Sequence, residues 1–306
     1  MKFEKMYSTI DTHVAGEAFR IIIHSSIVLG KKSLKENAAF VKENYQFEKD
    51  LLLNEPRGHR GMNGCIVLPS QKADFALLFL NHDPQVTFQY SGLAAAVTGL
   101  LETGNLPEKA SSLYNIETTE GVFTVKAPLE NGEVMKVQME NRSCTVTGRE
   151  DHFITAVADG SRQYLIYNLP ESVPALEMQY ISAIISWGKK TAEHLHRSGT
   201  DFQGFILKEA RDPGENTVRS VTFGKDGGII RSPGVDSTLL LYTAAPEQSE
   251  GSGKFTNESI FGSKLTARLI SKEENQFSIE LKSFVTGIHQ FILAEEDPLR
   301  NGFLLK

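Results

Sequence analysis

The sequence has little cysteine and no long apolar run. Two cysteines occur among 306 residues, Cys65 and Cys144, so a disulfide-stapled fold is excluded and we expect both thiols to be free and buried. No apolar run approaches the roughly 18 residues that a membrane-spanning helix needs. Residues 1–17 carry charged and polar side chains throughout, unlike a secretory signal peptide. We therefore expect a cytoplasmic protein without a membrane span.

Positive charge and the common cofactor motifs are also scarce. Lys and Arg number 32 against 38 Asp and Glu, a formal net charge of -6, which is the wrong sign for a nucleic-acid partner. The phosphate loop, the dinucleotide fingerprint, Cys-x-x-Cys and His-Glu-x-x-His are all missing. His194 and His196 lie two apart on a predicted helix, where side chains point in different directions, so we expect exposed histidines and no metal site.

The predicted elements occur twice in the same order. Each copy has strands, an amphipathic helix, further strands and an apolar segment that opens with small residues. The first copy comprises residues 19–29, 33–53, 64–69, 74–81 and 91–104, and the second comprises 118–127, 132–141, 144–148, 171–198, 202–210, 217–224 and 234–245. This repeat predicts an α+β fold of two pseudo-symmetric lobes, residues 1–132 plus 283–306 and residues 133–282, each a β-sheet wrapped around a central helix.

The starts of the two apolar segments, at Ser91 and Gly234, are candidate anion-binding sites. A helix N-terminus offers unpaired backbone N–H groups and the positive end of the helix dipole. If the two ends faced each other across a cleft, one carboxylate could lie between them. The alternative is that Ser91 only caps its helix, the common role of serine at a helix start.

Two further polar segments allow a functional and a plain structural interpretation. Thr12, His13 and Glu17 form either a polar cluster or the turn between two strands. Residues 55–64 (EPRGHRGMNG) combine a proline, three glycines, two arginines and a histidine. Such a loop either carries function or only reverses the chain.

Five segments resemble the proline racemase superfamily, which includes proline racemases, hydroxyproline 2-epimerases and trans-3-hydroxyproline dehydratases. They are residues 10–20 (IDTHVAGEAFR), 55–69 (EPRGHRGMNGCIVLP), 90–104 (YSGLAAAVTGLLETG), 218–241 and 295–305 (EEDPLRNGFLL). Residues 90–104 resemble a first active-site motif that usually begins Cys-Gly-His. Residues 218–241 resemble a second, usually Asp-Arg-Ser-Pro-Cys-Gly-Thr-Gly. The resemblance implies a diaminopimelate-epimerase-like fold of two pseudo-symmetric lobes.

The resemblance also implies a chemistry without cofactor or metal. In the racemases and epimerases, one cysteine from each lobe flanks the substrate α-carbon, and the two exchange its proton from opposite faces. Ser91 and Gly234 stand at these two positions here. The implied ligand is a small amino or imino acid, and a homodimer is common in the family. The backbone N–H groups implied to hold its carboxylate are those of Gly92, Leu93, Val235 and Asp236.

The departures from both motifs bear on the reaction. Leu93 replaces the histidine of the first motif, and Ile230 replaces the aspartate of the second, which is expected to meet the substrate ammonium. Gly234 has no side chain and transfers no proton, so two-base inversion is not available from these positions. A single-base elimination, like that of the dehydratases, needs only Ser91 activated by a neighbour such as His59.

Asp236 allows two interpretations. Its carboxylate either acts as a replacement base or caps the second helix, and as a base it would oppose a substrate carboxylate. Three functions follow from the whole sequence. The first is cofactor-independent removal of the Cα proton from proline, hydroxyproline or a related amino acid. The second is a non-catalytic paralogue that binds a small carboxylate or a partner, and the third is a related enzyme with moved catalytic groups and another substrate.

Overall fold

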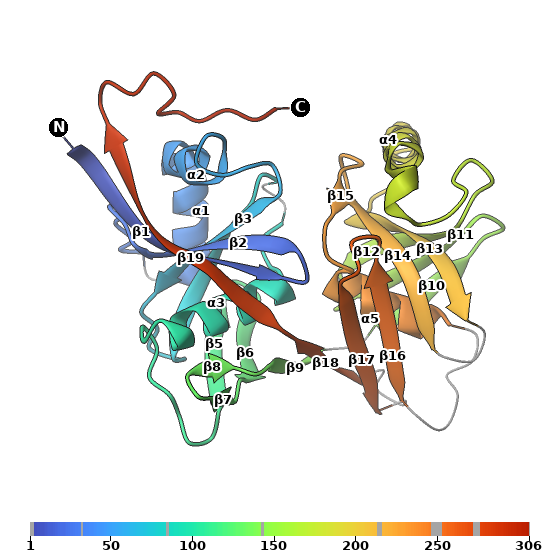
Figure 1. Ribbon diagram of the computed structural model, residues 1–306, viewed down its shortest axis with the longest axis horizontal. Coiled ribbons are helices and arrows are strands. Elements are labelled where there is room, and N and C mark those ends of the chain that lie inside the picture. Colours follow the sequence, from blue (N-terminus) through green and yellow to red (C-terminus); the bar gives the residue numbers. More distant parts are fainter. Residues whose placement is uncertain are drawn as a thin grey trace. The chain divides into compact units, whose positions relative to one another are not determined.

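The computed structural model describes residues 3–31, 33–83, 86–141, 144–212, 216–245, 253–271 and 276–305. The chain divides into two compact units (Figure 1), one of Met1–Val137 with Lys282–Lys306 and one of Gln138–Leu281. Within the described ranges, no helix combines the length and the apolar character needed to cross a membrane.

The first unit contains a sheet of seven successively paired strands with helices on both faces. Its elements are β1 (Phe3–Val14), β2 (Glu17–His24), α1 (Leu34–Asn44), α2 (Gln46–Leu53), β3 (Met62–Leu68), β4 (Phe75–Leu80), α3 (Tyr90–Glu102), β5 (Leu113–Thr118), β6 (Gly121–Lys126), β7 (Leu129–Glu130), β8 (Glu133–Val134) and β19 (Ser283–Ala294). The strands pair in the order β19-β1-β2-β3-β4-β5-β6. The strand β9 (Val137–Asn141) leads out of this unit.

The second unit is built in the same way. Its elements are β10 (Cys144–Arg149), β11 (Phe153–Ala158), β12 (Arg162–Asn168), a short 3-10 helix (Met178–Tyr180), α4 (Ile181–Arg197), β13 (Gly204–Asp212), β14 (Thr217–Gly224), β15 (Ile229–Ile230), α5 (Val235–Ala244), β16 (Lys254–Ser259), β17 (Lys264–Ser271) and β18 (Gln276–Leu281). The strands pair in the order β10-β11-β12-β13-β14-β16-β17-β18.

The pairing directions repeat between the units. From β19 to β6, and again from β10 to β17, successive pairs are antiparallel, antiparallel, parallel, antiparallel, parallel and antiparallel. The first parallel pair is connected through α1 and α2 or through α4, and the second through α3 or α5. Parallel strands need such helical crossovers. The pseudo-symmetric α+β fold expected from the repeat is confirmed.

In each unit one helix lies inside the fold and the other covers the outer face. In the first unit α2 and α3 lie on opposite faces of the strands (Figure 1). Neighbouring residues on β2 point in opposite directions, so each contacts a different helix. Ile22 packs with the α2 leucines, whereas Ile21 meets α3 at Gly99. Every residue of α3 from Tyr90 to Leu101 is buried, as expected for a helix that is apolar on all sides.

Two predicted helices have different bounds in the structure. The helix expected over 33–53 is interrupted at Tyr45, which has non-helical dihedral angles, and a capping box formed by Ser33 and Glu36 starts its first half. The helix expected over 171–198 begins ten residues later, at Ile181. Pro174 lacks a backbone N–H and disfavours a helical residue before it, and the chain ahead of α4 forms turns and the short 3-10 helix instead.

Candidate functional site

Ser91 lies in the first turn of α3 but does not cap it. The helix starts at Tyr90, its N-cap is Gln89, and no side chain caps it, so the capping interpretation of Ser91 is wrong. Ser91 is only 5% exposed. The backbone N–H of Gly92 donates to the Gln89 carbonyl at 3.1 Å. A Cβ at Gly92 would lie 2.4 Å from the Phe79 ring, so only glycine lets this turn pack against β4.

A buried carboxylate is attached to the same end of α3. Glu17 accepts a hydrogen bond from the Gln89 side chain at 3.0 Å and lies 3.4 Å from the amide nitrogen of Asn63. Glu17 follows directly on the Ala15–Gly16 turn, where both residues have positive φ. The interpretation of residues 12–17 as a strand-end turn is therefore confirmed. Sequence reasoning missed Gln89, whose signal was its place two residues before Ser91.

Gly234 is the N-cap of α5 and has a backbone conformation that favours glycine. Its φ of 78° and ψ of 133° lie in a region that residues with a Cβ rarely adopt. A Cβ built there would lie 3.1 Å from the Ser237 hydroxyl, which itself bonds to the Thr222 hydroxyl at 2.7 Å. This position is shaped for glycine, and buried hydroxyl groups occupy the adjacent space.

Further buried polar groups hold the residues before α5. The Asn257 amide donates to the Pro233 carbonyl at 3.3 Å, and the Thr238 hydroxyl donates to the Gly234 carbonyl at 2.7 Å. The Gly234 N–H donates to the Ser232 hydroxyl at 3.2 Å. Because buried polar groups with partners hold a single arrangement, the start of α5 is well defined.

Asp236 neither caps α5 nor has a free oxygen. Its Oδ2 accepts from Arg162 Nε at 2.8 Å and from the Tyr164 hydroxyl at 3.2 Å, and its Oδ1 accepts from Arg162 Nη2 at 3.0 Å. No side chain caps the helix, so the capping interpretation is wrong. Although burial opposes it, Asp236 raises the pKa of the Arg162 guanidinium, which stays charged. The two-point contact with Arg162 fixes the orientation of this carboxylate.

The three remaining candidates are apolar. Leu93 is fully buried in α3 and Val235 is buried at the start of α5. Ile230 is half-buried on β15, directly opposite Thr222 of β14. These side chains bring no charge to either turn. The two turns therefore offer backbone groups and hydroxyls. Asp236, in the first turn of α5, is the one acidic side chain among the predicted site residues.

Both cysteines are free and buried, as expected. Burial raises the pKa of the Cys65 thiol, and burial together with Asp236 raises that of Cys144. Neither thiol ionises readily, so neither substitutes for the cysteines that the resemblance leads one to expect.

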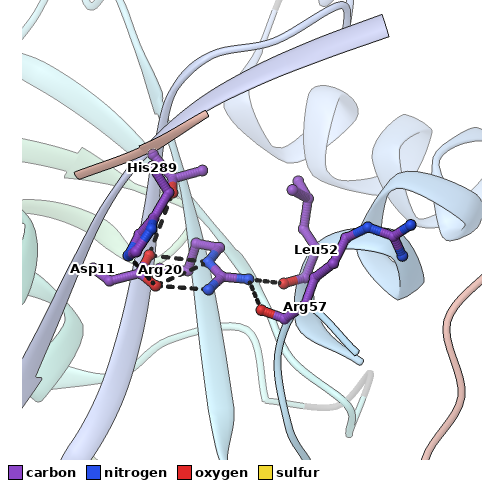
Figure 2. Close-up of polar contacts among 6 residues, drawn as sticks. Asp11, Arg20, Leu52, Arg57 and His289 are labelled. Carbon is purple, nitrogen blue, oxygen red and sulfur yellow. Dashed lines mark hydrogen bonds and ion pairs between the residues drawn. The ribbon is translucent and has the colours of Figure 1, made fainter. Parts of the chain in front are cut away.

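Sequence reasoning also missed a buried ion pair between two neighbouring strands. Asp11 and Arg20 are cross-strand partners on β1 and β2, and Arg20 donates to both carboxylate oxygens, with its Nη2 at 2.6 Å from Oδ2 (Figure 2). Arg20 Nη1 also donates to the carbonyls of Leu52 and Arg57. His289 Nε2 lies 3.5 Å from the Asp11 carboxylate. The signal was the equal spacing of Asp11 and Arg20 about the turn.

This ion pair connects three of the segments that resemble the family. Arg57 forms an ion pair with Asp297, and Glu55 exchanges two backbone hydrogen bonds with Phe303. Residues 10–20, 55–64 and 295–305 therefore meet in one structural unit. The loop 55–64 has a structural role here, and His59 Nδ1 accepts from the Gly61 N–H at 3.1 Å.

Two histidines lie near the C-terminal end of α4. His194 and His196 are exposed, and His196 Nε2 lies 2.8 Å from the Lys225 carbonyl. Among the residues that the structure describes, no three His, Cys, Asp or Glu side chains group closely enough to hold a metal ion.

A change at His82 is expected to alter the pH dependence of stability. Burial lowers the pKa of His82, against a weaker opposing effect of the His59 carbonyl, 3.4 Å away. The unfolded chain then takes up the proton more readily than the folded protein. The contribution of neutral His82 to the free energy of unfolding is therefore complete above about pH 6.5 and is lost as the pH falls through the lowered pKa. We expect His82→Asn to lose less stability than the wild type between pH 7 and pH 5, measured by urea unfolding. Identical losses would contradict this expectation.

A substitution of Gly234 by alanine is expected to destabilise the protein by about 1–3 kcal/mol, because the added Cβ forces an unfavourable φ. Gly148→Ala is the matched control, since a Cβ there meets only Thr155, at 3.7 Å. Thermal and urea unfolding of both variants measure the difference. Equal stability of the two variants would contradict the assigned conformation. Cysteine at 234 carries the same strain.

Together, the repeated strand order and the two inner helices define a pseudo-symmetric α+β protein of the diaminopimelate-epimerase-like class. A solved hydroxyproline epimerase from Agrobacterium vitis, with bound trans-4-hydroxy-L-proline, superposes with a TM-score of 0.80 at 21% identity, covering 100% of this chain and 97% of that one. A phenazine biosynthesis protein of the PhzF family from Bacillus anthracis superposes with a TM-score of 0.62 at 12% identity, over 96% of this chain and 100% of that one.

The family model described as proline racemase matches residues 9–304. A trans-3-hydroxy-L-proline dehydratase from Bacillus cereus is 29% identical over the full length of both chains. A proline racemase from Acetoanaerobium sticklandii is 25% identical over 99% of each chain. The chain therefore belongs to the proline racemase family, and it is an enzyme of this kind.

Proposed function

We propose that this enzyme is a dehydratase acting on trans-3-hydroxy-L-proline or a closely related 3-hydroxy amino acid. The observation that carries the proposal is the conformation of Gly234. A positive φ, with the Ser237 and Thr222 hydroxyls beside it, leaves no side chain at the second proton-transfer position and little room for one. Inversion at Cα needs a group on each face, whereas elimination needs one.

The stereochemistry of the substrate suits a single group. In trans-3-hydroxy-L-proline the hydrogen on C2 and the hydroxyl on C3 lie on the same face of the ring. A neighbouring carboxylate takes the hydroxyl proton of Ser91, and the Ser91 oxygen takes the C2 proton while the C2–C3 double bond forms and the C3–O bond breaks. The same serine returns the C2 proton to the leaving group, which departs as water, and recovers its own proton from the carboxylate. The resulting enamine tautomerises to the cyclic imine.

The position of Ser91 supports this role. Its hydroxyl lies in the first turn of α3, where the positive end of the helix dipole stabilises a developing negative charge. A serine still needs a base nearby to work well. Glu17 is the buried carboxylate attached to this end of the helix through Gln89, and it is the base that we assign.

The relatives support the same reaction class. The curated protein at 29% identity over its full length carries the name of a dehydratase for this substrate, and the one at 25% carries that of a racemase. A non-catalytic carboxylate-binding protein is not favoured, because the full-length relatives with these names are enzymes.

The proposal is tested by incubating the purified protein with trans-3-hydroxy-L-proline and with trans-4-hydroxy-L-proline in deuterated water. Nuclear magnetic resonance of the mixture follows the products. We expect the first compound to lose water and the second to keep its configuration. Epimerisation of the second compound at C2, without dehydration of the first, would overturn the proposal.

We also propose a cytoplasmic homodimer that contacts through one face of β19. Alternate residues of a strand share a face, and Ile288 and Ile292 are exposed on this one, with Met6 of β1 opposite Ile292. An exposed apolar stripe of this kind usually marks an interface. We expect light scattering to give a dimer mass for the wild type and a monomer mass for Ile288→Lys. A dimer that survives this change would contradict the assigned face.

A further inference from the structure

The first turn of α5 carries an acidic side chain where an anionic substrate has to bind. This inference rests on the proposed function and on the family resemblance, which implies that backbone N–H groups of that turn hold the substrate carboxylate. Asp236 is the second residue of the helix. A carboxylate left to itself at this point would repel the substrate, since like charges brought together at a binding site oppose association. The structure contains a group that removes this conflict.

That group is Arg162, the first residue of β12. It contacts both oxygens of Asp236, through Nε at 2.8 Å and Nη2 at 3.0 Å, and the Tyr164 hydroxyl adds a third contact at 3.2 Å. Both side chains are largely buried, with 19% of Arg162 and 14% of Asp236 exposed. A two-point contact between a guanidinium and a carboxylate fixes orientation as well as charge. The carboxylate is thereby held toward β12.

A simple capping role does not explain this arrangement. An aspartate in the first turn of a helix usually accepts from the helix's own N–H groups. Asp236 makes no such cap, although α5 has no other side-chain cap. Its oxygens are engaged by Arg162 and Tyr164 instead. The N–H groups of the turn are thus not covered by the one acidic side chain that could cover them.

The cluster also has a defined charge. Arg162 lies between two carboxylates, since Asp159 contacts it at 2.7 Å on the other side. One cation and two anions leave a single negative charge. Removal of Arg162 would leave two negative charges beside the helix start, and removal of the Asp236 charge would leave none.

We infer that Arg162 is a positioning residue for substrate binding: it neutralises Asp236 and holds its carboxylate away from the N–H groups of the first turn of α5. Substrate affinity therefore follows the charge of the cluster. A direct contact between Arg162 and the substrate carboxylate is the competing role. The two roles differ in the behaviour of the double variant, because a direct contact is not replaced when Asp236 is neutralised.

The test compares Arg162→Gln, Asp236→Asn and the double variant in the full chain. The probes are L-proline binding by calorimetry and the steady-state kinetics of trans-3-hydroxy-L-proline. We expect R162Q to weaken L-proline binding and raise KM about tenfold, with kcat changed less than about threefold. D236N shifts affinity in the opposite direction, and the double variant returns to within about threefold of the wild type.

The matched control is Arg197→Gln, which removes an exposed arginine paired with Glu193 on α4 and is expected to leave both readouts unchanged. A double variant as weak as R162Q would overturn the inference while leaving the proposed function intact. If R162Q does not fold, D236N decides, and weaker L-proline binding by D236N overturns it. Binding of L-proline without dehydration of trans-3-hydroxy-L-proline contradicts the proposed reaction alone. A wild type that binds no L-proline contradicts both.

Discussion

The Ser91→Ala variant is expected to lose dehydration of trans-3-hydroxy-L-proline by about 10³-fold or more in kcat/KM. Ser91 is the only side chain that the account places at a proton-transfer position, because the other position is Gly234. Loss of the hydroxyl removes both the base for the C2 proton and the acid for the leaving group. The hydroxyl makes no cap, so the α3 helix keeps its start.

Two further variants separate chemistry from folding. Ser91→Cys keeps a group that carries a proton and is expected to retain part of the activity, since a thiol ionises more easily than a hydroxyl. Ser198→Ala, at the end of α4, removes a serine hydroxyl that bonds to Leu195 and Thr200 and is expected to leave the kinetics unchanged. Full activity of Ser91→Ala would remove the assigned residue from the mechanism.

The largest loss of stability is expected for Arg20→Gln, at about 3–5 kcal/mol, because the change leaves the Asp11 carboxylate buried without its charge partner. Arg20 is 3% exposed and Asp11 is 7% exposed, so water does not replace the lost contact. The variant also removes hydrogen bonds to the carbonyls of Leu52 and Arg57. Urea unfolding at pH 7 measures the change.

A control variant and a double variant show whether the loss comes from the buried ion pair. Arg197→Gln, on an exposed part of α4, is expected to change the free energy of unfolding by less than about 0.5 kcal/mol. The double variant Asp11→Asn with Arg20→Gln is expected to recover part of the loss, because no unpaired charge remains. An equal effect of R20Q and R197Q would show that the buried ion pair does not hold the unit together.

The fold could be predicted where a pattern is long and one-sided. The apolar run of α3 and the alternation of β14 coincide with the elements found. The strands β1 and β19 were not predicted, since they pair across almost the whole chain length. Apolar residues on both faces of β19, such as Ile288 on one and Leu293 on the other, also hide its alternation.

The site was predictable only as far as the motifs reach. The small residues that open the two apolar segments indicated Ser91 and Gly234 as helix starts, and the resemblance added their catalytic role. Both lie at the starts of the inner helices. The positive φ of Gly234 has no signal apart from the glycine itself. The contact of Arg162 with Asp236 joins residues 74 positions apart, so no local pattern announces it. Sequence spacing alone therefore favoured capping by Asp236, and the tertiary ion pair replaced it.

The most direct test of the account uses L-proline, which cannot lose water. The wild type is incubated with it in deuterated water, and chiral chromatography with mass spectrometry follows the deuterium content of each enantiomer. A single proton-transfer group exchanges the Cα hydrogen and returns deuterium to the same face. We therefore predict deuterated L-proline with no D-proline. Formation of D-proline at a rate comparable to exchange would contradict the account, because it requires a second group on the opposite face.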